Sequence, residues 1–165
     1  MELQWCQRCV LPSSRPWLVF ENGICSACRA KDEEQSVDWF ARLHEWEALV
    51  EKTKKLRRSY DVVLPVSGGK DSIWQTRVCL DYGLRVLAFT WKPAVRTEIG
   101  QYNLEALKRL GVDHLDFTIN PKLEQKMHRR SFEELGADSA MHLGVFASVQ
   151  RYAYLLNVPL IVWSE

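Results

Sequence analysis

Two groups of residues have types and spacings that could do chemistry. The first is the run Ser67, Gly68, Gly69, Lys70, Asp71 and Ser72, which we call the glycine loop; it follows a short apolar run and precedes a segment with a helical pattern. Two glycines let successive backbone N–H groups turn into one anion-binding concavity. The following helix adds its positive N-terminal end, and the lysine and two hydroxyls add further donors. The sequence therefore predicts an oligophosphate site here.

Two common phosphate-binding motifs do not fit the glycine loop. A Walker A loop requires a glycine where Leu64 stands and a serine or threonine where Asp71 stands. The dinucleotide fingerprint fails because no glycine has the required spacing from Gly68. The alternative interpretation is a plain turn in which Asp71 and Ser72 only begin a helix. The strand–turn–helix context favours phosphate binding.

The second group is a set of four cysteines, which we call the cysteine cluster. It consists of two C-x2-C pairs separated by fifteen residues: Cys6, Cys9, Cys25 and Cys28. Each pair presents two thiolates on one turn, and two such turns close a tetrahedral site that suits Zn²⁺. An iron–sulfur cluster or redox pairs are the alternatives. Four thiolates leave no open coordination position, so we expect a structural site that holds together a segment with few aliphatic residues.

The elements that must position these groups follow from hydrophobic periodicity. Residues 36–58 are predicted as one amphipathic helix with Ser36 as N-cap and Asp38 in its first turn. Beyond this helix, apolar strands alternate with helical patterns. The predicted strands span residues 61–66, 85–91, 114–119 and 160–163, and the predicted helices span 71–82, 99–110, 122–130 and 141–156.

This alternation predicts an α/β fold with a doubly wound parallel sheet, because solidly apolar strands must be covered on both faces. In such sheets ligands bind at the carboxyl ends of the strands, where the glycine loop stands. We expect three regions: a zinc-ribbon-like knuckle at residues 1–35, a connecting helix at 36–59 and an α/β domain at 60–165. The domain is expected to be incomplete, because a central-type strand runs into the last residue.

Composition narrows the class of protein. The chain has 165 residues, 47% of them hydrophobic and 26% charged, with a formal net charge of +1. Such a balance gives no electrostatic reason to expect nucleic acid as the main partner. Neither a signal peptide nor a membrane span is predicted, so we expect a cytoplasmic protein.

The glycine loop resembles the S-G-G-x-D-S loop of the PP-loop ATP pyrophosphatases. The resemblance implies an adenine nucleotide alpha-hydrolase-like fold, ATP as substrate and cleavage between the α- and β-phosphates. The loop would hold the leaving pyrophosphate, and Asp71 would help to place Mg²⁺. Adenosine would lie across the ends of the first two strands, near Val66 and Thr90. Lys70, Asp71 and Glu165 are the expected catalytic residues, with Glu165 the acidic candidate at the last strand end.

Most of the chain resembles the N-acetyl sugar amidotransferase family of lipopolysaccharide and O-antigen biosynthesis. The segments that carry the resemblance are CQRCVLPSSRPWLVFENGICSACR, YDVVLPVSGGKDSIWQ, VLAFTWKP, NLEALKRLGVDHLDFTIN and PLIVWSE, in the family's order. In the last segment Ser164 replaces a glycine of the family pattern. The resemblance covers about the first half of a family member.

This second resemblance implies an ATP-dependent amidotransferase. ATP would adenylate an acetamido or carboxyl oxygen of a nucleotide-linked N-acetyl sugar, and ammonia would then displace AMP. A separate glutaminase subunit would supply the ammonia.

The alternatives are a tRNA 2-thiolation enzyme with the same adenylation chemistry and a non-catalytic ATP-binding fragment. Many thiolation enzymes use cysteines that follow the ATP loop. Here only Cys79 follows it, within a predicted core helix.

Overall fold

The computed structural model describes residues 3–93, 95–136 and 139–164. The chain divides into two compact units, Met1–Trp46 and Glu47–Glu165, and the division falls within one helix, α2 (Trp39–Lys55). The N-terminal unit holds a hairpin of β1 (Phe20–Glu21) and β2 (Ile24–Cys25), followed by α1 (Ser26–Gln35). Asn22 and Gly23 connect the hairpin with positive φ angles of 52° and 78°, the conformation that favours Asn-Gly in tight hairpins.

The predicted helix over residues 36–58 is corrected by the structure. Ser36 is the C-cap of α1, where its hydroxyl donates to the carbonyl of Glu33 at 2.7 Å, so the prediction of Ser36 as an N-cap was wrong. Asp38 accepts the N–H of Ala41 at 3.0 Å, and α2 begins at Trp39. A carboxylate that captures a free N–H of the first turn fixes the start of a helix, whereas a serine hydroxyl is equally able to satisfy the last carbonyls of the helix before it.

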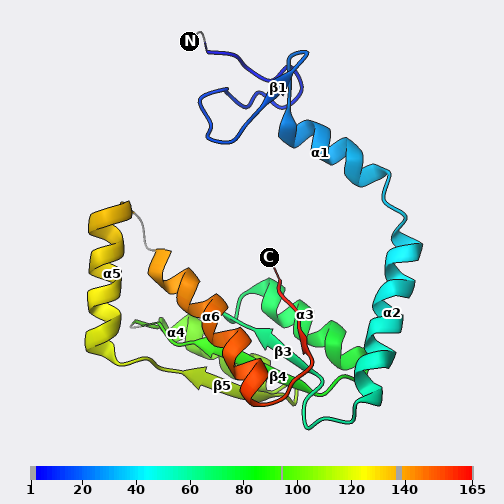
Figure 1. The fold of residues 1–165 in the computed structure, drawn as a ribbon, viewed down its shortest axis with the longest axis vertical. Helices are drawn as coiled ribbons and strands as arrows, with labels where there is room; N and C mark the ends of the chain where they lie inside the picture. Colours follow the sequence, from blue (N-terminus) through cyan, green and yellow to red (C-terminus); the bar gives the residue numbers. More distant parts are fainter. Residues whose placement is uncertain (1–2, 94, 137–138, 165) are drawn as a thin grey trace. The chain divides into compact units, whose positions relative to one another are not determined.

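The C-terminal unit alternates strands and helices, as predicted (Figure 1). Its elements are β3 (Val62–Pro65), α3 (Lys70–Asp81), β4 (Val86–Trp91), α4 (Glu98–Lys108), β5 (Asp113–Phe117), α5 (Pro121–Leu135), α6 (Ser139–Leu155) and β6 (Leu160–Ile161). The four strands form a parallel sheet in the order β5-β4-β3-β6. The chain therefore proceeds from β3 towards β5 on one side and returns to the other side with β6, which is a doubly wound arrangement. The order reverses beside β3.

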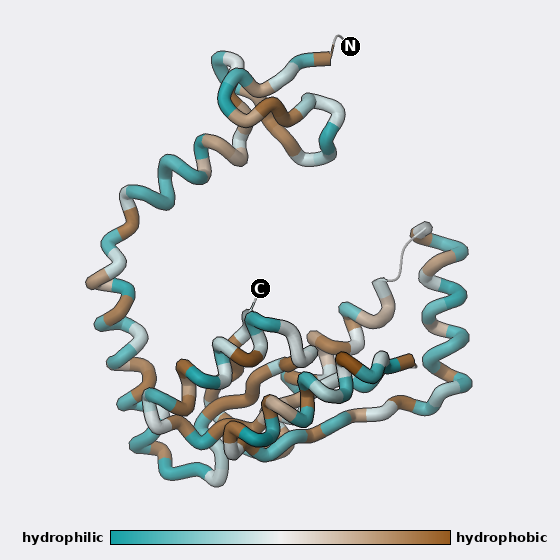
Figure 2. Tube along the Cα trace, turned by 180° about the vertical axis from the view of Figure 1, so that it is seen from behind, coloured by the Kyte–Doolittle hydropathy of each residue, from teal (hydrophilic) through white to brown (hydrophobic). Residues whose placement is uncertain are grey.

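The central strands β3 and β4 are apolar except for Thr90, and they are buried on both faces of the sheet. Val63, Leu87 and Phe89 pack against Val149 and Ala153 of α6 in one hydrophobic cluster. Because side chains alternate along a strand, the intervening residues of β3 and β4 point to the opposite face, where α3 contacts both strands. Hydrophobic residues follow the strands, while α1 is mostly hydrophilic (Figure 2).

The fifth cysteine, Cys79, is 1% exposed on α3. Burial raises the pKa of its thiol to about 11, so Cys79 is an inert core residue, as predicted. Among the described helices none combines the length and apolar character needed to cross a membrane.

Candidate functional site

The glycine loop lies at the carboxyl end of β3, beside the point where the strand order reverses. Gly69 is the N-cap of α3 in an extended conformation, and no side chain caps this helix end. The N–H groups of the first turn of a helix have no acceptors within the helix, so they remain available to an anion. The structure thus joins a strand-end turn to an open helix N-terminus, which is the geometry predicted for phosphate binding.

Internal hydrogen bonds hold the glycine loop in shape. The N–H of Ser67 donates to Oγ of Ser72 at 3.0 Å, and the N–H of Gly69 lies 3.4 Å from Oγ of Ser67. Ser72 is buried. Gly68 has φ of +83°, and a Cβ at this position would lie 3.2 Å from Cβ of Asn103 and 3.3 Å from the backbone nitrogen of Leu104. Both the conformation and the close approach to α4 therefore require glycine.

Lys70 and Asp71 form the exposed edge of the glycine loop. Nζ of Lys70 lies 2.7 Å from each carboxylate oxygen of Asp71, and the two side chains are 87% and 62% exposed. A salt bridge this exposed is worth less than about 1 kcal/mol. Both side chains are consequently able to exchange this contact for a phosphate or a cation.

A cavity of about 450 Å³ opens at the carboxyl ends of the strands. We call it the strand-end cavity. Its lining includes four of the predicted nucleotide contacts: Val66, Ser67, Ser72 and Thr90. Gly68, Gly69, Lys70 and Asp71 belong to the glycine loop but are not among the lining residues. The expected catalytic residue Glu165 lies outside the described residues.

The cavity also contains an aromatic wall that the sequence analysis did not predict. Trp91, Phe146 and Trp163 line it, and the rings of Phe146 and Trp163 are 4.6 Å apart. Gly144 permits this packing, because a Cβ there would come within 2.8 Å of the Trp91 ring. A glycine inside the apolar stripe of a predicted helix was the available signal, since such glycines usually mark a close approach.

Arg96 and Thr97 reach the cavity from the segment between β4 and α4. The two terminal nitrogens of Arg96 donate to the two carboxylate oxygens of Asp116 at 2.7 Å each. Thr97 caps α4 by accepting the N–H of Gly100 at 3.1 Å. Both side chains already hold this segment in place, so their first role is to shape the cavity.

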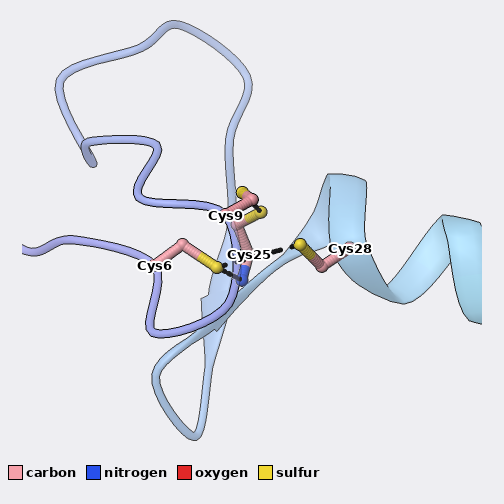
Figure 3. Close-up of side chains that lie close together, drawn as sticks. All are labelled: Cys6, Cys9, Cys25 and Cys28. Atoms are coloured by element: carbon pink, nitrogen blue, oxygen red, sulfur yellow. Dashed lines mark hydrogen bonds between the residues drawn. The ribbon is translucent and has the colours of Figure 1, made fainter.

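The four cysteines come together in the N-terminal unit. Their sulfur atoms all lie within 4.8 Å of one another, and the described cysteines are free thiols (Figure 3). Cys6 and Cys9 come from the first loop, Cys25 from β2 and Cys28 from the first turn of α1.

Distances and donors in the cysteine cluster fit a tetrahedral metal. Sulfur pairs lie at 3.9 Å (Cys6 and Cys28) and 3.5 Å (Cys9 and Cys25). With Zn–S bonds of about 2.3 Å, tetrahedral geometry places the sulfurs about 3.8 Å apart. Desolvation opposes ionisation of Cys6, but the N–H groups of Cys25 and Arg8, each 3.4 Å from its sulfur, outweigh it and lower the pKa of this thiol to about 6. Hydrogen bonds from neighbouring thiols, together with desolvation, raise the pKa of Cys28 to about 12. The spacing of the four sulfurs is therefore the observation that supports a metal site.

Solved structures provide the comparison for the fold. NMN synthetase from Francisella tularensis is similar over 71% of this chain, with a TM-score of 0.50 and 22% sequence identity. An NH3-dependent NAD synthetase from Campylobacter jejuni, in complex with nitrate, is similar over 76% of the chain, with a TM-score of 0.51 and 18% identity. The chain shares the fold of these two synthetases.

The similarity covers only part of each synthetase. The chain matches 52% of the NMN synthetase and 56% of the NAD synthetase, so it spans about half the length of the structures it matches. No protein-family model and no curated protein sequence matches it. At these identities the comparison establishes an α/β fold with a parallel sheet like that of the two synthetases, and it does not extend to their substrates.

Proposed function

We propose that the glycine loop binds the β- and γ-phosphates of ATP and that the chain provides the nucleotide-binding half of an ATP-dependent amidotransferase. The observation that carries this proposal is the junction of the glycine loop with the uncapped N-terminus of α3 at the mouth of the strand-end cavity. The loop supplies backbone N–H groups, and Lys70 supplies a mobile positive charge. The cavity beside Val66 and Thr90 would take the nucleoside.

The proposed reaction has two steps. A carbonyl oxygen of the acceptor attacks the α-phosphorus of ATP, the bond to the β-phosphate breaks, and pyrophosphate leaves. Ammonia then attacks the activated carbon, loses a proton, and AMP leaves with the electron pair of the carbon–oxygen bond. N–H groups of the glycine loop would stabilise the charge that develops on pyrophosphate. Asp71 would hold Mg²⁺, which neutralises phosphate charge when bound.

The proposed acceptor is a nucleotide-linked N-acetyl sugar, within surface-polysaccharide biosynthesis in the cytoplasm. Support comes from the sequence resemblance described above, which spans both the cysteine pairs and the glycine loop. Ammonia as nucleophile gains support from a structural neighbour that is named as NH3-dependent. A separate glutaminase subunit is the proposed source of the ammonia.

We also propose that the cysteine cluster holds one structural Zn²⁺. Under this proposal residues 1–35 form the zinc-binding segment, residues 36–59 connect it, and residues 60–165 form the ATP-binding domain. All four thiolates would be ligands, so the metal would stabilise the segment and would take no part in the reaction.

The runner-up function is tRNA 2-thiolation. Sulfur transfer requires a reactive thiol near the activated carbon, but Cys79, which is the cysteine that follows the glycine loop, is buried with a raised pKa. This observation disfavours thiolation by this chain. A non-catalytic nucleotide-binding fragment remains the third candidate.

The acceptor is tested by measuring nucleotide products. Because the chain alone is not expected to complete the reaction, the full-length protein is incubated with MgATP and ammonium chloride, and with either a nucleotide-linked diacetamido sugar or unmodified tRNA. We expect AMP only with the sugar and ammonium, and we expect Lys70→Ala to lower the rate by at least about tenfold if Lys70 contributes 1.4 kcal/mol. Lys122→Ala, on exposed α5, is the matched control and keeps the full rate.

Other products would change the conclusion. AMP formed only with tRNA would favour thiolation, and ADP in place of AMP would refute pyrophosphate cleavage. ATP binding with no product from either acceptor would favour the non-catalytic candidate.

A further inference from the structure

A short hydrogen-bonded relay joins three neighbouring strands beside the strand-end cavity. It runs from Val66, just after the carboxyl end of β3, through Thr90 near the carboxyl end of β4, to His114, the second residue of β5. Oγ1 of Thr90 lies 2.7 Å from the carbonyl oxygen of Val66 and 2.8 Å from Nε2 of His114. Thr90 and Val66 line the cavity, whereas His114 stands behind them on β5. His114 was not among the residues that the sequence singled out.

The direction of each hydrogen bond in this relay follows from counting protons. The Val66 carbonyl can only accept, so the single hydroxyl proton of Thr90 must point to it. If Thr90 donated to His114 instead, two oxygen lone pairs would face each other at 2.7 Å. Thr90 therefore accepts from His114, and Nε2 of His114 must carry a hydrogen.

The surroundings of His114 favour a neutral ring in this tautomer. Desolvation lowers the pKa of His114, and this effect outweighs the negative charge of Asp116, which raises the pKa. Asp116 is itself occupied by the two terminal nitrogens of Arg96. A neutral imidazole with its proton on Nε2 satisfies the contact with Thr90.

The backbone donors beside the relay are also occupied. The N–H of Val66 donates to the carbonyl of Phe89 at 2.8 Å, and the N–H of Ser67 donates to Oγ of Ser72 at 3.0 Å. The polar groups that Val66 and Thr90 offer to the strand-end cavity are therefore acceptors. Each oxygen keeps one lone pair for a ligand.

We propose that His114 is a specificity-determining positioning residue. It fixes the Thr90 hydroxyl so that Thr90 and Val66 offer only hydrogen-bond acceptors to the strand-end cavity, and these acceptors select a nucleobase that donates from an amino group. The proposal rests on the proposed ATP site. Adenine carries an exocyclic amine at position 6, whereas hypoxanthine carries an oxygen there. That oxygen would face acceptor lone pairs and lose a hydrogen bond.

The test compares the dissociation constants of ATP and ITP, whose bases differ at position 6. We expect the wild-type protein to prefer ATP. His114→Phe keeps the ring volume but removes the donor. The Thr90 proton is then held by the Val66 carbonyl alone, and the hydroxyl can turn this proton towards a ligand oxygen. Because one hydrogen bond contributes about 0.5–1.5 kcal/mol, the preference should fall by about 2–12-fold.

Three further variants separate this role from general destabilisation. His114→Gln can place an N–H donor near the position of Nε2 and should restore most of the preference. Thr90→Val removes the hydroxyl and should lose the preference even if His114→Phe does not fold. His44→Phe changes an exposed histidine on α2 and should leave the preference unchanged.

The ¹⁵N chemical shifts of His114 provide a second readout, independent of the ligand. A proton on Nε2 is expected, and a proton on Nδ1 alone would overturn the relay. An unchanged ratio of ITP to ATP affinity in His114→Phe would overturn the specificity role. Failure of the wild type to bind either nucleotide would refute the proposed function, while the tautomer would still decide the relay.

Discussion

At the scale of single residues, Asp61 shows how one buried carboxylate fixes the start of the sheet. Its side chain is 1% exposed and accepts three hydrogen bonds from Arg85, from the backbone N–H at 2.8 Å, from Nε at 2.9 Å and from Nη2 at 2.7 Å. These contacts join the residues that immediately precede β3 and β4. The Arg85 guanidinium holds the pKa of Asp61 below its ordinary value, although desolvation opposes this shift.

Asp61→Asn should destabilise the C-terminal unit. The substitution weakens three hydrogen bonds from Arg85 to a buried carboxylate, but the Arg85 side chain is 48% exposed and can be hydrated. The expected cost is therefore that of losing a hydrogen bond to a charged group, about 1.5–3 kcal/mol. The free energy of unfolding in urea at pH 7 measures this effect. Asp81→Asn, which changes an exposed carboxylate that pairs with Arg77, is the control and should cost less than about 1 kcal/mol. Equal losses in the two variants would show that Asp61 has no special role.

The same contact predicts a pH dependence. Because the pKa of Asp61 is lower in the folded protein than in the unfolded chain, its contribution is complete above the unfolded pKa of about 3.9. The contribution is lost as the pH falls through the lower folded value. Asp61→Asn should therefore show a smaller loss of stability than the wild type when urea unfolding is repeated at decreasing pH below about 4.

At the scale of elements, the approach of α6 to β4 depends on Gly144. Alanine usually favours a helix over glycine by about 1 kcal/mol. A Cβ at residue 144, however, would lie 2.8 Å, 2.9 Å and 3.2 Å from three atoms of the Trp91 ring. Overpacking of this kind costs about 1–3 kcal/mol, so Gly144→Ala should be destabilising overall.

A double-mutant cycle with Trp91→Leu tests this explanation. In the Trp91→Leu background the ring is absent, so Gly144→Ala should become neutral or stabilising in thermal unfolding. Destabilisation by the same amount in both backgrounds would show that the cost does not come from the ring.

Elements with apolar periodicity were predictable, and those without it were not. Each predicted strand and helix of the C-terminal unit is present, although α5 extends to Leu135 and β6 is only Leu160–Ile161. The helix α1 was missed because none of its residues is buried, so no apolar stripe marks it. The contact between Asp32 and Arg8 at 2.6 Å, which ties α1 to the first cysteine loop, is not visible in a hydrophobic pattern.

Some features of the candidate site were predictable from the sequence and others were not. The glycine loop and the cysteine pairs are local in the sequence, so their residue types and spacing were sufficient to place them. The aromatic wall and the His114 relay join elements that are distant in the sequence, and their geometry depends on the order of the strands. Ser36 was misassigned because a hydroxyl can cap either end of a helix.

At the scale of the whole molecule, the two compact units have different sources of stability. The C-terminal unit contains a buried sheet, whereas the N-terminal unit holds few buried residues apart from Cys6 and Cys25. A segment this small, with so few buried residues, needs a cross-link such as a structural metal to stay folded. If the cysteine cluster binds Zn²⁺, the metal supplies most of the folding free energy of the N-terminal unit.

Metal analysis of purified protein should find one zinc per chain. Cys28→Ser should lose the metal, and chelation should expose the N-terminal unit to protease while the C-terminal unit resists digestion. Cys79→Ala is the control: it should keep the zinc but lower the unfolding temperature of the C-terminal unit, because it removes a buried sulfur. If the analysis finds iron and the protein absorbs visible light, the cysteine cluster holds an iron–sulfur cluster and the zinc proposal is wrong. A folded N-terminal unit without any metal would also contradict the proposal.

The central claim is that the glycine loop holds the pyrophosphate part of ATP. The most direct test titrates the protein with MgATP by calorimetry, with and without inorganic pyrophosphate, and repeats the titration with two alanine variants. Gly68→Ala should weaken binding by about 5–30-fold, since a left-handed conformation costs a residue with a Cβ about 1–2 kcal/mol. Gly111→Ala has a similar positive φ of +93° but an open site, and it should bind as the wild type does. We predict that pyrophosphate competes with MgATP in the wild type and in Gly111→Ala, and that this competition is lost in Gly68→Ala. MgATP binding that is unaffected by pyrophosphate and by the Gly68 substitution would contradict the claim.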